Sequence, residues 1–255
     1  MSDFPAQVDG VPVVAFETVG STNAEALDRA KGGARGPLWF VARRQTAGRG
    51  RRGRTWVSEP GNLYASLLLT DAAPAHAAAG VCFVAAVALH DALLDAVHGL
   101  APEQLKLKWP NDLLVNGKKL AGILVEGATL ADNHAALAVG LGVNCRHHPT
   151  STEFATTDLA ALGYAVDPVR LFAMLGRTMN VRLAEWARGE NFGVTRSAWL
   201  ARATGLGSPI EVRLANRSVA GTFDAIDATG ALILRRGDGS CETIASGDVF
   251  PLTVA

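Results

Sequence analysis

The sequence predicts an α+β fold in two parts, and three observations support this. Residues 1–205 mix helix-like and strand-like segments. A cluster of glycine, serine and proline at 204–209 then marks a boundary. Beyond it, residues 206–255 hold short strand-like segments separated by turns, a pattern typical of a small β-barrel.

The elements of the first part follow from hydrophobic periodicity and from cap signals. Residues 11–16 form a short apolar run with β-branched side chains, typical of a strand. The helix after it begins at a cap made either by Ser21 with Ala24 or by Thr22 with Glu25. The same rules predict strands at 38–42, 62–69, 105–109, 113–115, 118–126 and 134–143, and helices at 76–97, 168–187 and 195–203.

Turn signals predict the remaining connections. Asn116-Gly117 lies between two of these strands and is a strong β-hairpin signal, because both residue types tolerate positive φ. In the second part, turns at 215–217 and 227–230 separate the short strands. Those strands are predicted at 210–214, 218–226, 231–234 and 242–245.

The overall composition argues against several classes of protein. The 24 basic residues balance the 24 acidic ones, so no charge bias indicates a nucleic-acid or membrane surface. Three cysteines far apart fit neither a disulfide framework nor a paired-cysteine metal site, which predicts a cytoplasmic protein. The N-terminus lacks the basic and apolar regions of a signal peptide. The apolar segment 77–97 carries His90, Asp91 and Asp95, so we expect a buried helix there and not a membrane span.

One basic stretch stands out against this balance. Residues 48–54, the arginine loop, contain three glycines and four arginines. Glycine weakens a helix or strand interior by roughly 0.5–1 kcal/mol per residue, so we expect a loop. Four fixed positive charges repel one another, and the loop is therefore expected to be mobile until an anionic ligand, such as a phosphate-bearing small molecule, neutralises them.

The arginine loop also matches two generic phosphate-binding patterns, and we reject both. Its letters fit G-x-G-x-x-G and, with Arg54-Thr55, a P-loop that has arginine in place of lysine. Both patterns require a helix directly after the glycines. Here Pro60-Gly61 gives a turn and residues 63–69 give a strand, so that helix is not predicted.

Three further stretches place polar residues next to apolar strands. They are Lys-Trp-Pro-Asn-Asp at 108–112, Lys-Leu-Ala-Gly-Ile-Leu-Val-Glu at 119–126 and Gly-Leu-Gly-Val-Asn at 140–144. Each alone has an ordinary explanation, as a turn, a solvated lysine or close backbone packing. Together with the arginine loop, in this order and spacing, they resemble the biotin protein ligases, and Ser-Thr-Asn at 21–23 matches another motif of that family. The resemblance spans about residues 13–255.

The resemblance implies a fold and a reaction. The fold would be a catalytic domain similar to class II aminoacyl-tRNA synthetases, with a mixed sheet flanked by helices, followed by a small SH3-like β-barrel. The reaction would join biotin and ATP to give biotinyl-5′-adenylate and pyrophosphate, after which a lysine of a biotin carrier domain attacks the adenylate. A site rich in cations suits this chemistry, because two anions must be brought together.

The resemblance also implies roles for individual residues. Arg49, Arg51 and Lys119 would be catalytic. The biotin-binding set would be Ser21, Thr22, Asn23, Gln45, Arg49, Gly50, Arg51, Lys119 and Gly122. The ATP-binding set would be Arg51, Arg54, Trp56, Lys108, Asn111, Asp112 and Asn144. Asp112 or Asn144 would lie near a Mg²⁺, a hard cation suited to oxygen ligands.

The implied partner is a biotin carboxyl carrier domain, and either a monomer or a homodimer fits. Some family members carry an N-terminal DNA-binding module, but only about ten residues precede the first predicted strand. We therefore expect no operator binding, and neither a nucleic-acid nor a membrane partner.

Two alternatives remain. A lipoate or octanoate transferase shares the implied fold, although its usual signature lacks the arginine loop. A non-enzymatic nucleic-acid-binding module would use residues 43–54 as a basic patch, and it predicts basic residues across a whole face.

Overall fold

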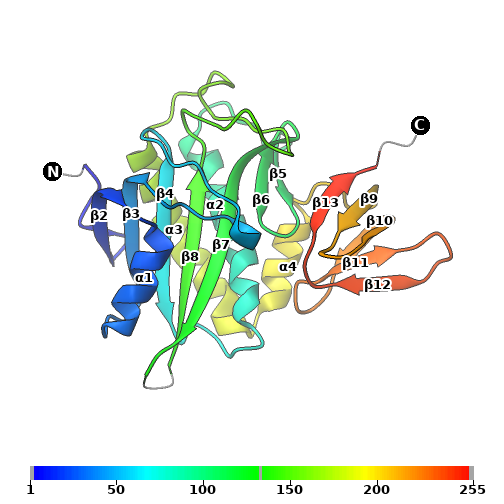
Figure 1. The fold of residues 1–255 in the computed structure, drawn as a ribbon, viewed down its shortest axis with the longest axis horizontal. Helices are drawn as coiled ribbons and strands as arrows, with labels where there is room; N and C mark the ends of the chain where they lie inside the picture. The colour runs from blue at the N-terminus through cyan, green and yellow to red at the C-terminus, as the bar shows by residue number, and fades with distance from the viewer. Residues whose placement is uncertain (1–2, 132–133, 253–255) are drawn as a thin grey trace.

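The computed structural model describes residues 3–131 and 134–252, which form two sheets and the helices around them (Figure 1). The larger sheet has eight strands in the order β1-β2-β3-β4-β8-β7-β6-β5. Its neighbouring strands are antiparallel except β2 and β3, which run parallel. The smaller sheet has five antiparallel strands in the order β12-β11-β10-β9-β13. The predicted α+β class, with a mixed sheet followed by a C-terminal antiparallel one, is confirmed.

The elements follow the predicted order, with two short strands added. The larger sheet contains β1 (Gln7–Val8), β2 (Val11–Val19), β3 (Leu38–Gln45), β4 (Leu63–Thr70), β5 (Leu105–Lys108), β6 (Asp112–Val115), β7 (Lys118–Thr129) and β8 (Ala135–Val143). The smaller sheet contains β9 (Pro209–Arg213), β10 (Ser218–Ile226), β11 (Leu232–Arg235), β12 (Cys241–Ile244) and β13 (Asp248–Pro251). The helices are α1 (Thr22–Lys31), α2 (Val81–Ala96), α3 (Pro168–Trp186) and α4 (Phe192–Leu200), with 3₁₀ turns η1 (Arg51–Gly53), η2 (Ala78–Gly80) and η3 (Ala187–Gly189). Strands β1 and β13 were not predicted. Strand β1 has two residues and β13 has four, and neither shows a distinct hydrophobic pattern.

The two faces of the larger sheet are covered by different helices. On one face α1 packs through small residues such as Ala26 and Ala30. On the other face α2 and α3 pack against the main core (Figure 1). Alternate residues of a strand point to opposite faces. Leu141 of β8 therefore lies in the main core, while its neighbours Gly140 and Gly142 point to the α1 face.

Helix α2 is the buried helix that the sequence predicts. The stretch from Ala78 to Ala96 is long and apolar enough to cross a membrane by composition alone. Within the protein, however, 67% of that apolar window is buried. Its apolar character is explained by packing against α3 and the sheet.

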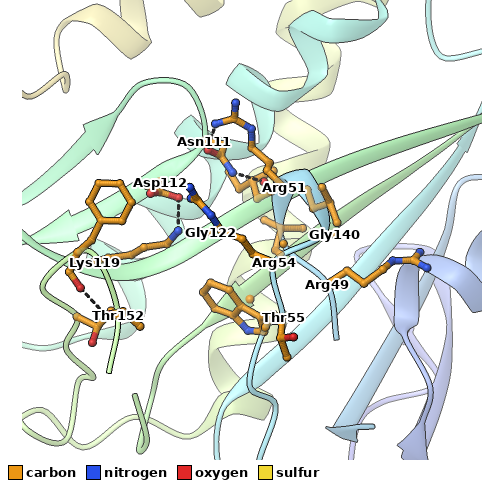
Figure 2. Close-up of a pocket in the computed structure, with 18 of the residues that line it drawn as sticks. Arg49, Arg51, Arg54, Thr55, Asn111, Asp112, Lys119, Gly122, Gly140 and Thr152 are labelled. Carbon is orange, nitrogen blue, oxygen red and sulfur yellow. Dashed lines mark hydrogen bonds and ion pairs between the residues drawn. The ribbon is translucent and has the colours of Figure 1, made fainter. Parts of the chain in front are cut away.

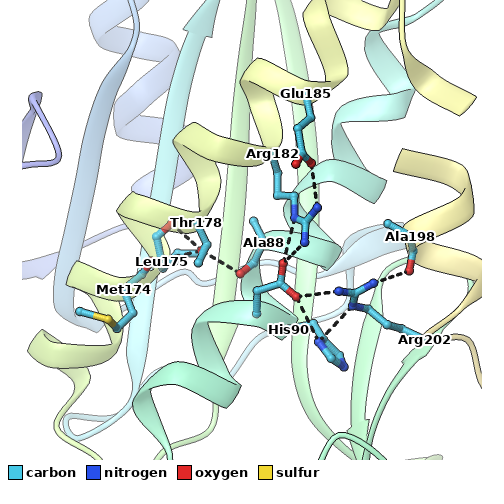
Figure 3. Close-up of polar contacts among 10 residues, drawn as sticks. Ala88, His90, Met174, Leu175, Thr178, Arg182, Glu185, Ala198 and Arg202 are labelled. Carbon is cyan, nitrogen blue, oxygen red and sulfur yellow. Dashed lines mark hydrogen bonds and ion pairs between the residues drawn. The ribbon is translucent and has the colours of Figure 1, made fainter. Parts of the chain in front are cut away.

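A charged cluster ties α2 to α3 and to the end of α4 (Figure 3). Arg182 of α3 donates to one oxygen of Asp91 at 2.9 Å, and Arg202 donates to the other at 3.0 Å. Burial alone would raise the pKa of Asp91, but hydrogen bonds and the charges of both arginines lower it to about 2. The carbonyl of Arg202 also accepts the N–H of Leu107 at 2.9 Å. The cluster therefore helps to hold β5, the strand that leads into residues 108–112.

The smaller sheet packs beside residues 108–112, which follow strand β5. The indole N–H of Trp109 donates to the carbonyl of Gly230 at 3.0 Å. On α4, Trp199 lies against Phe223 of β10, with ring centres 6.5 Å apart. These buried contacts join the two sheets into one core cluster.

A single side chain fixes the backbone turn that follows β8. The side-chain oxygen of Asn62 accepts the N–H groups of Cys145, Arg146 and His147 at 2.8, 2.9 and 3.1 Å. Its amide donates to the carbonyl of His147 at 2.8 Å, and the residue is only 4% exposed. One acceptor therefore satisfies three successive backbone donors in this turn.

Replacing Asn62 with alanine is expected to lower the free energy of unfolding by about 2–4 kcal/mol, since each buried N–H left without an acceptor costs about 1–3 kcal/mol. Urea denaturation followed by fluorescence measures this loss. The matched control is Asn180→Ala, which removes an exposed amide that donates to Asp9. We expect the control to change the free energy by less than about 0.5 kcal/mol, and equal losses in both variants would show that Asn62 does not hold the turn.

Candidate active site

One pocket on the α1 face of the larger sheet collects the residues assigned from the motifs (Figure 2). Its volume is about 330 Å³, within the range of small-molecule sites. The assigned residues that line it are Ser21, Thr22, Asn23, Gln45, Arg49, Gly50, Arg51, Arg54, Trp56, Lys108, Asn111, Asp112, Lys119, Gly122 and Asn144. The structure thus brings together every residue that the sequence singled out for a site.

The first turn of α1 supplies polar groups to this pocket. Ser21 is the helix cap, because its hydroxyl accepts the N–H of Ala24 at 3.4 Å. Thr22 instead donates its N–H and its hydroxyl to Gln45 Oε1 at 2.9 and 3.1 Å. Gln45 in turn donates to the hydroxyl of Ser58 at 3.0 Å. Of the two predicted caps, Ser21 is therefore the one used, which leaves Thr22 to orient the amide of Gln45.

Asn23 reaches from α1 to the far side of the pocket. Its amide donates to the carbonyl of Leu124 at 3.1 Å and to Glu126 Oε2 at 2.9 Å. Gly140 leaves the necessary space, since a Cβ there would lie 2.4 Å from Asn23 Oδ1. Glu126 also accepts from Arg49 at 3.0 Å. The helix and the arginine loop therefore share one carboxylate.

Two glycines form a flat platform for Trp56. Gly122 of β7 and Gly142 of β8 are paired in register. A Cβ would lie 2.6 Å from the indole if added to Gly142 and 3.1 Å from it if added to Gly122. The indole nitrogen is buried and has no hydrogen-bond partner among the described residues, and Lys119 Nζ lies 5.5 Å from the ring centre. Gly122 and Gly142 are therefore required because a larger side chain would collide with Trp56, and not because the backbone turns there.

The turn that contains Asn111 and Asp112 faces β7 and the arginine loop. Lys119 Nζ lies 2.6 Å from Asp112 Oδ1, and the two side chains are 22% and 12% exposed. Arg51 donates to Asn111 Oδ1 at 3.1 Å, and the Asn111 amide donates to the carbonyl of Ile123 at 2.6 Å. Figure 2 shows these side chains converging from three segments.

The arginine loop follows a defined path in the structure. It contains the single 3₁₀ turn η1, and no helix lies between η1 and β4, all of whose residues are described. The helix that both generic phosphate patterns require is therefore absent from residues 54–62. Arg51, Arg52 and Arg54 approach the carboxylate of Asp248 at 3.8, 3.2 and 2.7 Å. A carboxylate of the smaller sheet thus offsets the repulsion from which the mobility of the ligand-free loop was predicted.

Burial shifts the pKa values of two cations in the pocket. It lowers the pKa of Lys108 to about 8, although Asp112 acts in the opposite direction. The same ammonium lies 3.8 Å from the centre of the Phe154 ring. Burial also lowers the pKa of Arg51, with Asp248 opposing it, but a guanidinium stays charged in a protein.

Several residues that line the pocket lie outside the sequence motifs. They are Thr152, Glu153 and Phe154 in the loop after β8, and Asp248 and Val249 of β13. They belong to no motif, and their local sequence has the composition of ordinary loops and short strands. Only the tertiary fold brings them to the pocket.

Among the described residues, no group of three or more His, Cys, Asp or Glu side chains could hold a metal. Asp112 offers a carboxylate, but one of its oxygens already pairs with Lys119. Mg²⁺ is commonly held by one or two carboxylates together with substrate phosphates and water. Asp112 therefore fits the carboxylate that a phosphate-bound Mg²⁺ takes from a protein.

The pocket has two chemically different ends. Thr22 and Asn23 of α1 and Gln45 of β3 place hydroxyl and amide groups at one end, beside the Arg49–Glu126 pair. Lys108 and Lys119 offer cations at the other end, with the indole of Trp56 packed against β7 and β8. Such an arrangement suits a ligand with a polar, uncharged head and an anionic tail, placed next to a second anion.

Comparison with known proteins agrees with this chemistry. Residues 16–144 match the model of the Biotin/lipoate A/B protein ligase family, and residues 205–250 match that of the biotin protein ligase C-terminal domain. The chain is 43% identical to a biotin–[acetyl-CoA-carboxylase] ligase of Paracoccus denitrificans, over 90% of this chain and 96% of that protein. It is 31% identical to the bifunctional ligase/repressor BirA of Escherichia coli, over 95% of this chain and 75% of that protein.

A solved structure matches both sheets together. The biotin protein ligase of Aquifex aeolicus, solved in complex with biotin and ATP, superposes with a TM-score of 0.77 at 25% identity. The match covers 93% of this chain and 97% of that one. From its motifs, its fold and these relatives, the chain belongs to the biotin protein ligases.

Proposed function

We propose that the chain is an ATP-dependent biotin–protein ligase. It would form biotinyl-5′-adenylate from biotin and ATP, and then transfer biotin to a lysine of a biotin carboxyl carrier domain. The observation that carries the proposal is the single pocket in which motifs from separate parts of the chain converge. Family membership supports the same reaction, because named relatives are biotin ligases.

The neutral end of the pocket suits the head of biotin. The ureido ring of biotin offers one carbonyl acceptor and two N–H donors, which side chains of both kinds can match. We assign this end to Ser21, Thr22, Asn23, Gln45 and the backbone around Gly122. Their mutual hydrogen bonds support the assignment, because they hold the amide groups in fixed orientations before any ligand binds.

The cationic end suits the carboxylate of biotin and the phosphates of ATP. We assign Lys119, with Arg49, Gly50 and Arg51 of the arginine loop, to the place where the carboxylate meets the α-phosphate. The nucleotide would be served by Arg51, Arg54, Trp56, Lys108, Asn111, Asp112 and Asn144. An arginine about 4 Å from a phosphate is worth on the order of 4 kcal/mol at a near-surface dielectric. Asn144 is only 2% exposed and donates to the carbonyl of Thr157, so we expect it to act mainly by holding the adjoining loop.

The proposed chemistry has two displacement steps. A carboxylate oxygen of biotin attacks the α-phosphorus of ATP, and the bond to the β-phosphate oxygen breaks to release pyrophosphate. Arg51 and Lys119 would neutralise the charge that develops on the phosphorus oxygens. The ε-amino group of the carrier lysine, after losing a proton, attacks the acyl carbon and AMP leaves. The arginine loop would keep water away from the adenylate between the two steps.

We propose that Mg²⁺ enters with ATP, where it would neutralise phosphate charge, with Asp112 as its protein ligand. Two features support this reading. Asp112 lies in the pocket, and the described residues contain no group of three or more His, Cys, Asp or Glu side chains that could hold a metal by themselves. Lys119 would then leave Asp112 and pair with the biotin carboxylate and the α-phosphate.

The finer architecture is part of the proposal. We propose a division into 1–205 and 206–255, a class II synthetase-like catalytic domain and an SH3-like barrel. The separate family match of residues 205–250 and the five short antiparallel strands support it. We also propose a cytoplasmic monomer or homodimer that acts on a carrier domain, without a nucleic-acid or membrane partner. Three residues of the arginine loop, Arg49, Arg51 and Arg54, line the pocket, and this local placement supports the last point.

Pyrophosphate release tests the substrate directly. The matched family model covers lipoate as well as biotin ligases, so the choice between them needs an experiment. We expect ATP to yield pyrophosphate with biotin and not with lipoate or octanoate, measured by a coupled phosphate assay. Pyrophosphate release with lipoate but not with biotin would overturn the proposal and favour a lipoate ligase instead.

Replacing Lys119 with alanine is expected to reduce adenylate formation more than tenfold, because the carboxylate and phosphate lose a shared cation. The same change leaves the half-buried Asp112 without its partner, so the melting temperature is expected to fall as well. Lys119→Arg keeps a cation beside Asp112 and should regain melting temperature and part of the adenylate formation. A fall in melting temperature in Lys119→Ala with adenylate formation within twofold of wild type would assign Lys119 a structural role only.

The charge of Lys108 is expected to make the KM for ATP depend on pH. Burial lowers the pKa of this lysine to about 8, so its positive charge is lost as the pH rises through that value. We therefore expect the KM for ATP to rise severalfold between about pH 7 and about pH 9. Lys108→Arg, which stays charged over this range, should flatten the dependence. An unchanged pH profile in this variant would show that Lys108 does not contribute its charge to ATP binding.

A further inference from the structure

Strand β13 carries two side chains that reach the loops bordering the pocket. Asp248 and Phe250 are two residues apart and therefore lie on the same side of the strand. Val249, between them, is 7% exposed and belongs to the main core, which anchors the strand. β13 pairs with β9 at one end of the smaller sheet (Figure 1).

Asp248 holds the arginine loop. Its carboxylate lies 2.7 Å from Arg54, 3.2 Å from Arg52 and 3.8 Å from Arg51, and its side chain is only 11% exposed. The neighbouring carbonyl of Gly247 accepts two hydrogen bonds from Arg51, both at 3.3 Å. Arg54 also lies 3.7 Å from Glu153. Three arginines and two carboxylates leave one net positive charge, so the loop is held in place and still attracts anions.

Phe250 holds the loop on the other side of the pocket. Its ring stacks on that of Phe154, with centres 4.7 Å apart and planes 18° apart. Cations cover this pair of rings: Lys108 lies 3.8 Å from the centre of Phe154, and Arg213 lies 3.8 Å from the centre of Phe250. Arg213 also pairs with Glu153 at 2.9 Å. The four side chains therefore connect the smaller sheet, the loop after β8 and the end of β5.

We infer that β13 is a clamp in which Asp248 and Phe250 are positioning residues that hold the arginine loop and the loop 149–156 over the pocket. The smaller sheet then completes the nucleotide side of the site, although the residues assigned to that side from the motifs all lie in the larger part of the chain. The effect of the clamp on ATP rests on the proposed function. Its effect on the two loops does not.

Limited proteolysis without ligand tests the clamp independently of activity. Trypsin can cut after the arginines of residues 49–54, and chymotrypsin can cut after Phe154. We expect Asp248→Asn to speed tryptic cleavage in the arginine loop at least fivefold, and Phe250→Ala to speed chymotryptic cleavage after Phe154 by a similar factor. Asp248→Glu and Phe250→Tyr, which keep the carboxylate and the ring, should restore protection.

The matched control is Asp224→Asn. Its carboxylate lies on β10 of the same sheet and pairs with the exposed Arg235 at 3.1 Å, without lining the pocket. It should leave both cleavage rates within twofold of wild type. Cleavage rates in Asp248→Asn and Phe250→Ala that match this control would overturn the clamp.

Steady-state kinetics then tests the consequence for the site. Asp248→Asn is expected to raise the KM for ATP at least fivefold, because Arg51, Arg52 and Arg54 lose the carboxylate that holds them, whereas Asp224→Asn should leave this KM within twofold of wild type. A lower KM for ATP would mean that Asp248 only competes with the nucleotide, and would overturn its positioning role. If the wild-type chain forms no pyrophosphate with biotin, the proposed function fails, whereas the proteolysis result still decides whether the clamp exists.

Discussion

The pocket depends on the absence of side chains at three positions of the larger sheet. Gly122, Gly140 and Gly142 all face α1, and together they leave room for the indole of Trp56 and the amide of Asn23. An alanine at position 142 would place a methyl group 2.6 Å from the indole, and one at 140 would place it 2.4 Å from Asn23 Oδ1. Because neither contact can be accommodated without displacing a pocket residue, these backbone positions decide whether a ligand site can form at all.

The second constraint is electrostatic. A site built for two anions must stay folded before they arrive, although its cations repel one another. In the structure most of these cations have a carboxylate partner: Asp112 pairs with Lys119, Glu126 with Arg49, and Asp248 with three arginines, while Lys108 lies over the ring of Phe154. Breaking a mostly buried pair leaves a charge without a partner, unless another anion takes the place of the carboxylate. A multiply charged phosphate can take that place, which makes these pairs suitable placeholders for a ligand.

The part of the site that the sequence predicts is the part encoded locally. Residues such as Lys119 and Gly122 lie in one strand whose hairpin is predicted by Asn116-Gly117, so their proximity follows from pattern and turn chemistry. The cap was ambiguous because Ser21 and Thr22 are both good capping residues. Only the long-range bond from Thr22 to Gln45 distinguishes them.

The residues that the sequence could not predict are those whose position depends on how two sheets pack. Asp248 and Phe250 lie almost 200 residues from the arginine loop, in a strand of four residues whose pairing with β9 is decided by burial of Val249. Their approach to the loops comes from contacts such as Trp109 with Gly230, which join the sheets beside the pocket. One end of the pocket is therefore made by α1 and a rigid sheet, whereas the other is made by loops that a second sheet holds in place. Loops held mainly by ion pairs and one aromatic stack can open and close around a ligand. Opening them costs less free energy than opening the closely packed core of the larger sheet would.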